Sequence, residues 1–589
     1  MGTKYQLRRP PENVGFSKEK LNEIAAETGT RPVLVYALFN RGFNEKEIRK
    51  ILTSDEAGDE LMRKPLTEAE DAADRIIKAV KNNERIGIFA DYDCDGVTSG
   101  FVMQMGIIAI KRALKKSGGI YLHYPQRKDG YGLSNAYCES MKDKLDLVIT
   151  VDNGIATREQ EAILDKYGID LVVTDHHEPN PATIPMLNKT IIVDPCYSDV
   201  SRSYLAGVAV AYNVVRTAAR KVGITLNRGI FLPAVMLGTI SDCMPMSYEN
   251  ACYIKMGLWF LNNDENYVDF YREAFYDSYN KKVKLPPVIT AKDISFTIAP
   301  KVNSASRMGD TRVAASGLFL GIQKDKKTAD VAKALTKLND DRKEETKEIA
   351  DAVVSKITLA PEDRIACYDG EAYNKGLHGI IASKITDRYP DYPAFVYKKA
   401  DGVCSGSVRC ENDGIDCMDM FKQLKDEHVV EYCAGHSHAC VLSVKEEKLA
   451  DFISRFSELY DSLDILDVVK TVDAKESLAS LSNDFLEKVN EIPFTTQEKP
   501  VFFVPNVFIN RTRKMGKGKH IELTLADNTA VKKVNWWNMA QHYEDIGSPK
   551  QVHLVCSVQQ DFRSDKPCAT IDIIDMVPVK QEKEDAHAA

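Results

Sequence analysis

Short apolar segments alternate with helical stretches between residues 71 and 255, and this alternation constrains the fold more than any other feature of the chain. The segments IGIFA, LDLVIT, IDLVVT and TIIV are separated by stretches with helical periodicity, such as VTSGFVMQMGIIAIKRALKK. Short buried strands that alternate with helices are typical of a parallel β-sheet built from βαβ units. We therefore predict an α/β domain with a parallel sheet over residues 71–255.

Acidic residues or histidines follow each of these predicted strands. The residues at the first three strand ends are Asp91, Asp93 and Asp95, then Asp152, then Asp175, His176 and His177. In open α/β sheets ligands bind at the carboxyl ends of the strands, so we expect these side chains to converge on one crevice. Asp242, after another apolar stretch, adds a further carboxylate, whereas Asp194 could equally be a turn residue before Pro195 and is left outside the site.

Carboxylates packed this closely repel one another, and a bound cation is the natural compensation. The segment DYDCDG also matches the start of a calcium loop, but Val102 stands where that loop needs its twelfth-position glutamate. Imidazole alongside carboxylates suits Mn²⁺ or a similar metal better than Ca²⁺. The number of ligands predicts two cations, about 3.5 to 4 Å apart, that activate water against a phosphoester, with Asp152 between them.

The remaining chain divides by composition into further segments. We expect a helical lead-in over 1–70, a helical connector with one long charged helix over 256–360, and a second, smaller α/β domain over 361–460. Short strands over 461–580 predict a small β-barrel, and the polar tail 581–589 is expected to be disordered.

Composition indicates which classes of protein the chain does not fit. No apolar run reaches the roughly 18 residues that span a membrane, and the start lacks the apolar segment of a secretory signal, so a cytoplasmic location is expected. Thirteen scattered cysteines without a CxxC pair predict reduced thiols. A zinc site among Cys404, Cys410, Cys417, Cys433 and Cys440 stays open, although the spacing does not match the usual close pairs.

Taken together, the acidic and histidine motifs resemble the DHH phosphoesterase family, and the order of the other segments resembles its RecJ branch of single-stranded-DNA exonucleases. The resemblance covers roughly residues 30 to 580. It implies a DHH catalytic lobe, a DHHA1-like second lobe and an OB-like barrel, with Mn²⁺ or Mg²⁺ as cofactor. The metal ligands that it implies are Asp93, Asp95, Asp152, His176 and Asp242, with Asp91 as an additional acidic member. Asp175 would orient the site and His177 would face the substrate phosphate.

Further segments carry the resemblance beyond the metal site. QRKDGYGL, IAPKVNSASRMGD, GLHGIIASKI, SGSVRC and AGHSHAC are similar to conserved segments of this branch. By that similarity, the substrate-contacting residues would be Asn303, Arg307, Ser407, Arg409, Gly435 and His436. Small residues expose backbone N–H groups and arginine forks onto phosphate oxygens, so these residue types suit a phosphate site; ordinary turn chemistry explains any one of them alone.

The predicted barrel contains a basic loop, RTRKMGKGKH, followed by NWW. Arg511, Arg513, Lys514 and Trp536 are the candidate contacts to a single strand, because cations and aromatic platforms together bind unpaired nucleic acid. The alternative is a solvated hairpin with tryptophans in the barrel core, since only one of two adjacent strand residues can face outward.

These features predict a metal-dependent exonuclease that degrades single-stranded DNA from 5′ to 3′ in DNA repair or recombination. The alternatives are an oligoribonuclease or cyclic-dinucleotide phosphodiesterase of the same family, or a catalytically inactive DNA-binding scaffold. The resemblance also suggests a single-strand-binding protein or a helicase as partner, no membrane association, and a monomer.

Overall fold

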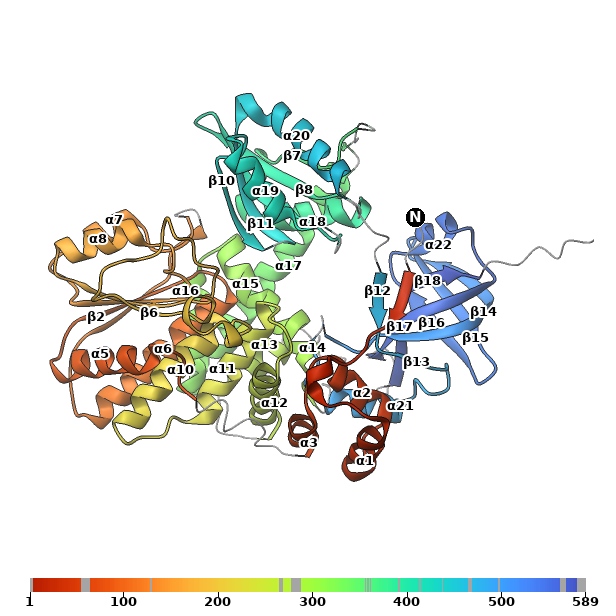
Figure 1. Ribbon diagram of the computed structural model, residues 1–589, viewed down its shortest axis with the longest axis horizontal. Coiled ribbons are helices and arrows are strands. Elements are labelled where there is room, and N and C mark those ends of the chain that lie inside the picture. Colours follow the sequence, from red (N-terminus) through yellow and green to blue (C-terminus); the bar gives the residue numbers. More distant parts are fainter. Residues whose placement is uncertain are drawn as a thin grey trace, which may run out of the picture.

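The computed structural model describes residues 4–53, 64–127, 130–263, 269–276, 288–354, 356–357, 360, 362–389, 392–412, 415–436, 438–463, 469–495, 498–561 and 568–579. These residues form two α/β units, a helical connector, and a C-terminal antiparallel unit against which the N-terminal helices pack (Figure 1). The predicted disordered tail lies outside the described residues. None of the helices in these ranges is long and apolar enough to cross a membrane.

Five parallel strands form the sheet of the first α/β unit, so the predicted parallel sheet is confirmed. They are β2 (Ile86–Ala90), β3 (Ile120–His123), β4 (Leu147–Val151), β5 (Asp170–Thr174) and β6 (Ile191–Val193), and their spatial order is β3-β2-β4-β5-β6. The strand β3 is additional to those that the sequence patterns predict. The direction of winding reverses between β2 and β4. Such a reversal opens a crevice at the carboxyl ends of the two strands, where α/β proteins bind ligands.

Helices cover both faces of this sheet (Figure 1). One layer contains α5 (Ala69–Lys81), α6 (Cys94–Ala113) and α10 (Gly207–Lys221). It is extended by α11 (Arg228–Ser241) and α12 (Tyr248–Asn263). The other layer contains α7 (Asn135–Ser140) and α8 (Arg158–Lys166). Ile88 of β2 packs in the first layer and its neighbour Phe89 in the second. Burial on both faces explains why the strands are apolar at every position.

A helical connector joins the two α/β units. It comprises α13 (Phe270–Tyr276), α14 (Ala291–Asp293), a π-helix (Ile294–Ile298), α15 (Ala299–Met308), α16 (Thr311–Ile322) and α17 (Lys327–Val354). The last of these, 28 residues long, is the predicted charged helix.

The second α/β unit has a mixed five-stranded sheet of order β10-β11-β9-β8-β7. Its elements are β7 (Ala366–Asp369), α18 (His378–Arg388), β8 (Ala394–Ala400), β9 (Val403–Arg409), α19 (Cys417–Asp426), β10 (Tyr432–His436), β11 (Ala439–Lys445) and α20 (Leu449–Ser462). Four of the cysteines considered for a zinc site are buried in its core: Cys404, Cys410, Cys417 and Cys440. No cysteine belongs to a cluster with metal-ligand spacing among the described residues.

The C-terminal unit is a curled antiparallel sheet of order β16-β15-β14-β17-β18. Its elements are β12 (Val469–Val472), β13 (Ala474–Lys475), α21 (Asn483–Asn490), β14 (Phe502–Met515), β15 (His520–Ala526), β16 (Val531–Trp536), α22 (Ala540–Asp545), β17 (Gln551–Asp561) and β18 (Cys568–Pro578). The sequence patterns predict β14, β15, β17 and β18 but miss β16.

The N-terminal segment belongs structurally to the C-terminal unit. The expectation of a purely helical lead-in is wrong at its start, where β1 (Lys4–Leu7) pairs in parallel with β12; α1 (Lys18–Thr28), α2 (Pro32–Asn40) and α3 (Glu45–Thr53) follow. Arg41 lies 2.9 Å from Asp473, and both side chains are 3% exposed. Segments more than 400 residues apart in the sequence therefore share one core (Figure 1).

Candidate metal centre and phosphate site

The turn between β2 and α6 carries the first three aspartates. Asp93 is the N-cap of α6, and its Oδ1 accepts a hydrogen bond from the backbone N–H of Gly96 at 3.0 Å. Asp95 faces α10 instead: its carboxylate accepts from the N–H groups of Gly207 and Val208 at 2.7 and 3.0 Å. Asp91 is buried, with Oδ1 unpaired among the described groups. The end of β2 and the start of α6 thus hold three carboxylates close together, with Asp95 turned towards α10.

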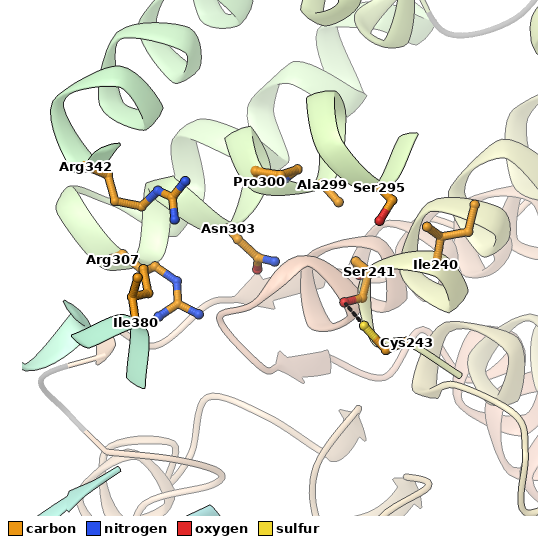
Figure 2. A pocket seen from close by; sticks show the side chains of 10 residues that line it. All are labelled: Ile240, Ser241, Cys243, Ser295, Ala299, Pro300, Asn303, Arg307, Arg342 and Ile380. Atoms are coloured by element: carbon orange, nitrogen blue, oxygen red, sulfur yellow. Dashed lines mark hydrogen bonds between the residues drawn. The ribbon is translucent and has the colours of Figure 1, made fainter. Parts of the chain in front are cut away.

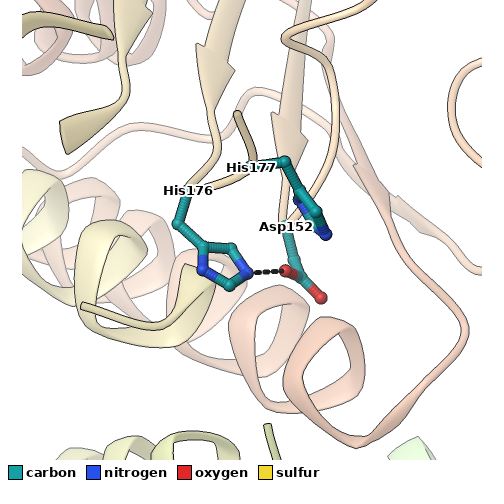
Figure 3. A group of neighbouring side chains, drawn as sticks. All are labelled: Asp152, His176 and His177. Carbon is teal, nitrogen blue, oxygen red and sulfur yellow. Dashed lines mark ion pairs between the residues drawn. The ribbon is translucent and has the colours of Figure 1, made fainter. Parts of the chain in front are cut away.

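Asp152 and His176 come from the ends of β4 and β5 and meet directly (Figure 3). Nε2 of His176 lies 3.1 Å from Oδ1 of Asp152, 3.6 Å from Oδ2 of Asp242 and 3.8 Å from Oδ2 of Asp95. Asp152 has a left-handed backbone conformation with φ of 60°, which is uncommon outside glycine and marks a constrained turn. The predicted convergence of these residues is confirmed.

The ligand atoms fall into overlapping groups in which each atom lies within 4.8 Å of the others. One group combines Asp95, His176 and Asp242, and another combines Asp91, Asp93 and Asp152. Asp152 also groups with His176 and His177, so it lies between the two sets. Asp152 thus shares one group with Asp91 and Asp93 and another with the two histidines.

The electrostatics of the cluster fit divalent cations. Burial and the charge of Asp93 raise the pKa of Asp91 to about 8, and the same two causes raise the pKa of Asp242 to about 7. Burial followed by Asp242 raises the pKa of Asp95, and burial followed by Asp95 raises that of Asp152. Buried carboxylates this crowded are stable as anions only beside a compensating positive charge, and their oxygens with one imidazole suit Mn²⁺ or Mg²⁺.

Asp175 orients the second histidine rather than joining the ligand groups. Its Oδ1 lies 2.7 Å from Nδ1 of His177 and accepts from the N–H of His176, while Oδ2 accepts from the N–H of Ile155. Burial opposes protonation of His177, but the charge and hydrogen bond of Asp175 raise its pKa to about 10. Asp194 caps the short helix α9 (Pro195–Ser198), which agrees with its interpretation as a turn residue.

Four arginines gather beside the acidic cluster. Burial, together with the charges of Arg127, Arg409 and Arg342, lowers the pKa of Arg307 to about 9. Arg307, Arg342 and Arg409 donate hydrogen bonds to uncharged oxygen atoms, those of Gly376, Asn339 and Val408. Nε of Arg127 is buried without a hydrogen-bond partner among the described residues. Arg127 packs over the ring of Tyr92 at 4.3 Å, next to Asp91. Guanidinium groups this close together repel one another, so a nearby anion would stabilise them, and a phosphate matches their fork geometry.

Arg307 and Arg342 line a pocket of about 230 Å³ between the first α/β unit and the connector (Figure 2). Ser241 and Cys243, on either side of Asp242, line its other wall. The pocket therefore lies next to the turn that carries Asp242, although Asp242 itself does not line it.

Asn303 also lines this pocket, one helical turn before Arg307 on α15 (Figure 2). Its Oδ1 accepts a hydrogen bond from the backbone N–H of Cys94 at 2.9 Å. Because Cys94 lies between Asp93 and Asp95, Asn303 holds the turn that carries both carboxylates.

The second α/β unit contributes the remaining predicted phosphate residues. Ser407 and Arg409 lie on one face of β9, and Gly379 on α18 permits the guanidinium of Arg409 to approach, because a Cβ there would lie 2.7 Å from Nη2. Gly435 lies on the neighbouring part of the sheet with φ of 127°. The side chain of His436 lies outside the described residues.

The residues of the C-terminal unit that were predicted to contact nucleic acid lie on its strands, and the prediction is wrong for Trp536. Trp536 is 4% exposed and packs in the core, so it cannot stack on a base; the exposed tryptophan is Trp537, at 47%. Arg513 pairs with Glu522 and Lys514 with Glu544 at 2.9 and 2.6 Å, whereas Arg511 has no ion pair among the described residues.

Sequence reasoning did not assign Arg127 and Arg342. Arg127 lies within the segment QRKDGYGL. A basic residue shortly before two glycines was the feature of the sequence that could have indicated a phosphate contact there. Arg342 lies in the charged helix α17, where nothing in the sequence distinguishes it from its solvated neighbours.

Comparison with known proteins identifies the family. The DHH family, N-terminal domain, matches residues 85–239, and the RecJ OB domain matches residues 472–573. The single-stranded-DNA-specific exonuclease RecJ of Haemophilus influenzae is 30% identical over 410 residues, covering 66% of this chain and 68% of that protein. The chain belongs to the RecJ family.

Similarity to RecJ extends over nearly all of the chain. RecJ of Bacillus subtilis is 25% identical over 571 residues, covering 94% of this chain and 68% of the relative. The crystal structure of RecJ from Thermus thermophilus in complex with Mn²⁺ superposes with a TM-score of 0.74 and 21% identity, covering 98% of this chain and 80% of that chain. The predicted fold class, with two α/β lobes and a C-terminal OB unit, is confirmed.

Proposed function

We propose that the protein is a metal-dependent exonuclease that hydrolyses single-stranded DNA from its 5′ end. The observation that carries this proposal is the convergence of Asp152, His176 and Asp242 on shared ligand positions beside the arginine cluster. The RecJ relatives are named as single-stranded-DNA-specific exonucleases. The intact ligand set favours an active enzyme over an inactive scaffold, and the OB unit favours a polymer over a small phosphodiester.

The metal ligands that we propose are Asp91, Asp93, Asp95, Asp152, His176 and Asp242, which together would hold two cations, Mn²⁺ or Mg²⁺. Cations bound there would activate water and would offset the charge that develops on the phosphate. Asp175 keeps the imidazole of His177 protonated and directed towards the crevice. We assign His177 to the scissile phosphate as a charged hydrogen-bond donor.

The arginine cluster would hold the substrate in place. We assign Arg127, Arg307, Arg342 and Arg409, whose charges act on one another beside the metal centre, to a phosphate next to the scissile bond. Charge-assisted fork contacts to phosphate fix both distance and orientation. Ser407, Gly435 and His436 on the second lobe remain proposed contacts to a neighbouring phosphate. Positioning by two lobes would bring the scissile bond to the metal centre only when a strand end has entered between them.

Degradation of DNA and RNA strands labelled at either end, with Mn²⁺, Mg²⁺ or a chelator, tests this function. We expect nucleotides to be released from the 5′ end of DNA only when the metal is present, and Asp152→Ala to abolish this release. Asp170→Asn is the matched control. Asp170 is the first residue of β5, at the end of the strand away from the metal cluster, and it pairs with Arg75. Release by Asp152→Ala at the wild-type rate would refute the mechanism.

We also infer that the protein acts as a monomer in the cytoplasm, with a single-strand-binding protein or a helicase to supply its substrate, in DNA repair or recombination. Single-stranded DNA is produced by unwinding or resection of a duplex. A partner that supplies it would therefore act before this protein in any reaction sequence. Co-sedimentation of the protein with a single-strand-binding protein tests the partner directly.

A further inference from the structure

A short turn before α18 contacts one of the four arginines at two places. The turn comprises residues 374–379 and includes a 3₁₀ helix (Lys375–Leu377) and the first two residues of α18. Nδ2 of Asn374 donates a hydrogen bond to the backbone oxygen of Arg307 at 3.1 Å, and Nη1 of Arg307 donates to the backbone oxygen of Gly376 at 2.8 Å. The turn 374–379 therefore holds both the main chain and the guanidinium group of Arg307.

The same turn also contacts Arg409, which comes from the end of β9. Gly379 lies against the guanidinium group of Arg409, and the next residue, Ile380, lines the same pocket as Arg307 (Figure 2). The charge of Arg409 acts on Arg307, so the two guanidinium groups are close enough to interact. One turn thus fixes two cations that belong to different parts of the fold, the connector and the second α/β unit.

His378 attaches this turn to the sheet of the second α/β unit. Its side chain is 0% exposed, and its Nε2 lies 3.1 Å from the backbone oxygen of Gly370. Because a carbonyl oxygen only accepts, Nε2 carries the proton and donates it. Gly370 directly follows β7, and its N–H donates to the backbone oxygen of Tyr397 on β8 at 2.7 Å. The imidazole therefore links the turn to two strands.

The space around this imidazole is fully used. A Cβ at position 370 would lie 2.9 Å from Nε2 of His378, so the ring packs directly against Gly370. Burial lowers the pKa of His378, which favours the neutral ring. A histidine that only fills space could be replaced by an apolar side chain of similar volume. A histidine that holds the turn needs a donor at the position of Nε2.

We propose that His378 is a positioning residue for the substrate phosphate, because it holds the turn 374–379 against Gly370 and so fixes Arg307 and Arg409 relative to each other. The proposal rests on the proposed action on a phosphodiester strand, which gives the two arginines a phosphate to bind. Guanidinium groups that are less well ordered bind phosphate more weakly, since the cost of ordering them is then part of binding. The metal ligands lie on other elements, so binding of the strand should suffer more than the chemical step.

Three substitutions distinguish a residue that holds the turn from one that fills space. In His378→Gln the amide nitrogen is as many bonds from Cβ as Nε2 of the imidazole, in His378→Asn it is nearer to Cβ, and His378→Leu has no donor. The substrate is a 5′-phosphorylated oligothymidine with Mn²⁺. We expect the asparagine and leucine variants to raise KM about tenfold with kcat within about twofold of the wild type. His378→Gln should keep KM within about threefold, and the Mn²⁺ concentration for half-maximal rate should be unchanged in all three.

A double-mutant cycle tests whether His378 acts through the arginines. In an Arg409→Gln background, His378→Asn should raise KM by less than about twofold, because both changes remove the same contact. The matched control is Arg455→Gln. Arg455 lies on α20, which packs on the opposite face of the sheet from α18, and it pairs with Glu427. In that background His378→Asn should still raise KM about tenfold.

Wild-type KM in the asparagine and leucine variants would overturn the proposal. Equal effects of all three substitutions, or additive effects of His378→Asn and Arg409→Gln, would overturn it as well. Anisotropy of a 5′-phosphorylated thymidine trinucleotide with a 3′ fluorophore, measured in chelator, repeats the comparison without hydrolysis. If the wild type released no nucleotides, the proposed exonuclease would fail. The affinities of the glutamine and asparagine variants for the trinucleotide would still decide the role of His378.

Discussion

Gly207, the first residue of α10, lies directly against the carboxylate of Asp152. A Cβ at position 207 would lie 2.6 Å from Oδ1 and 2.9 Å from Cγ of Asp152, closer than any real contact. The N–H of the same glycine donates to Asp95 at 2.7 Å. One small residue thus permits two carboxylates of the metal cluster to occupy their positions.

Replacing Gly207 with alanine should therefore damage the metal centre without unfolding the protein. We expect Gly207→Ala to weaken Mn²⁺ binding by about 10- to 100-fold, the range found when groups that orient metal ligands are changed. Isothermal titration with Mn²⁺ measures the affinity, and circular dichroism of the metal-free variant controls for folding. Wild-type Mn²⁺ affinity would show that the cluster does not depend on this contact.

Crowding of the carboxylates also predicts how pH affects the stability of the metal-free protein. The pKa of Asp91 is raised from 3.8 to about 8, so between these values the folded state binds protons more tightly than the unfolded chain. Its contribution to stability is present at low pH and is lost as pH rises towards 8. Mn²⁺ replaces these protons, so the Tm increase that it causes should be larger at pH 8 than at pH 5.

Thermal unfolding with Mn²⁺ or chelator, between pH 5 and 8.5, checks this expectation. Asp91→Asn removes one titrating group and should flatten the pH dependence in chelator. A Tm increase that is independent of pH would contradict the proposed crowding.

The strand ends could be located from the sequence because each ligand directly follows a run of apolar residues. Asp152 and His176 are adjacent in space because β4 and β5 are neighbours in a parallel sheet, which the βαβ pattern predicts. Arg342 could not be found in this way, because its proximity to Arg307 depends on how a charged helix packs against the connector.

Contacts between segments that are distant in the sequence could not be predicted from it either. The four residues KYQL form β1 only because β12 lies beside them. Lys4 pairs with Val469, which is 465 positions later in the sequence (469 − 4). The exposure of Trp537 rather than Trp536 follows from the register of β16 with β15, and two adjacent identical residues carry no signal of which faces outward.

The ion pair of Arg41 and Asp473 predicts that the N-terminal helices stabilise the OB unit. Each partner is almost fully buried, and Arg41→Ala would leave an unpaired carboxylate in the core, a change that typically costs about 3 to 5 kcal/mol. Tryptophan fluorescence during urea unfolding of a Trp259→Phe background reports on the unit, since the other two tryptophans, Trp536 and Trp537, lie within it. Lys488→Ala, which removes the exposed pair with Glu491, should cost about 1 kcal/mol or less, and equal effects of the two changes would contradict the prediction.

Asn303 couples the connector to the metal turn, and its removal should affect the metal before the substrate. Its Oδ1 accepts from the N–H of Cys94, so Asn303→Leu would leave that donor unsatisfied and release the turn that carries Asp93 and Asp95. We expect the Mn²⁺ concentration for half-maximal rate to rise about tenfold, with a smaller change in KM for DNA. Asn303→Asp keeps an acceptor at the same position and should bind Mn²⁺ more tightly than Asn303→Leu. If both variants instead raise KM alone, Asn303 acts on the strand and not on the metal turn.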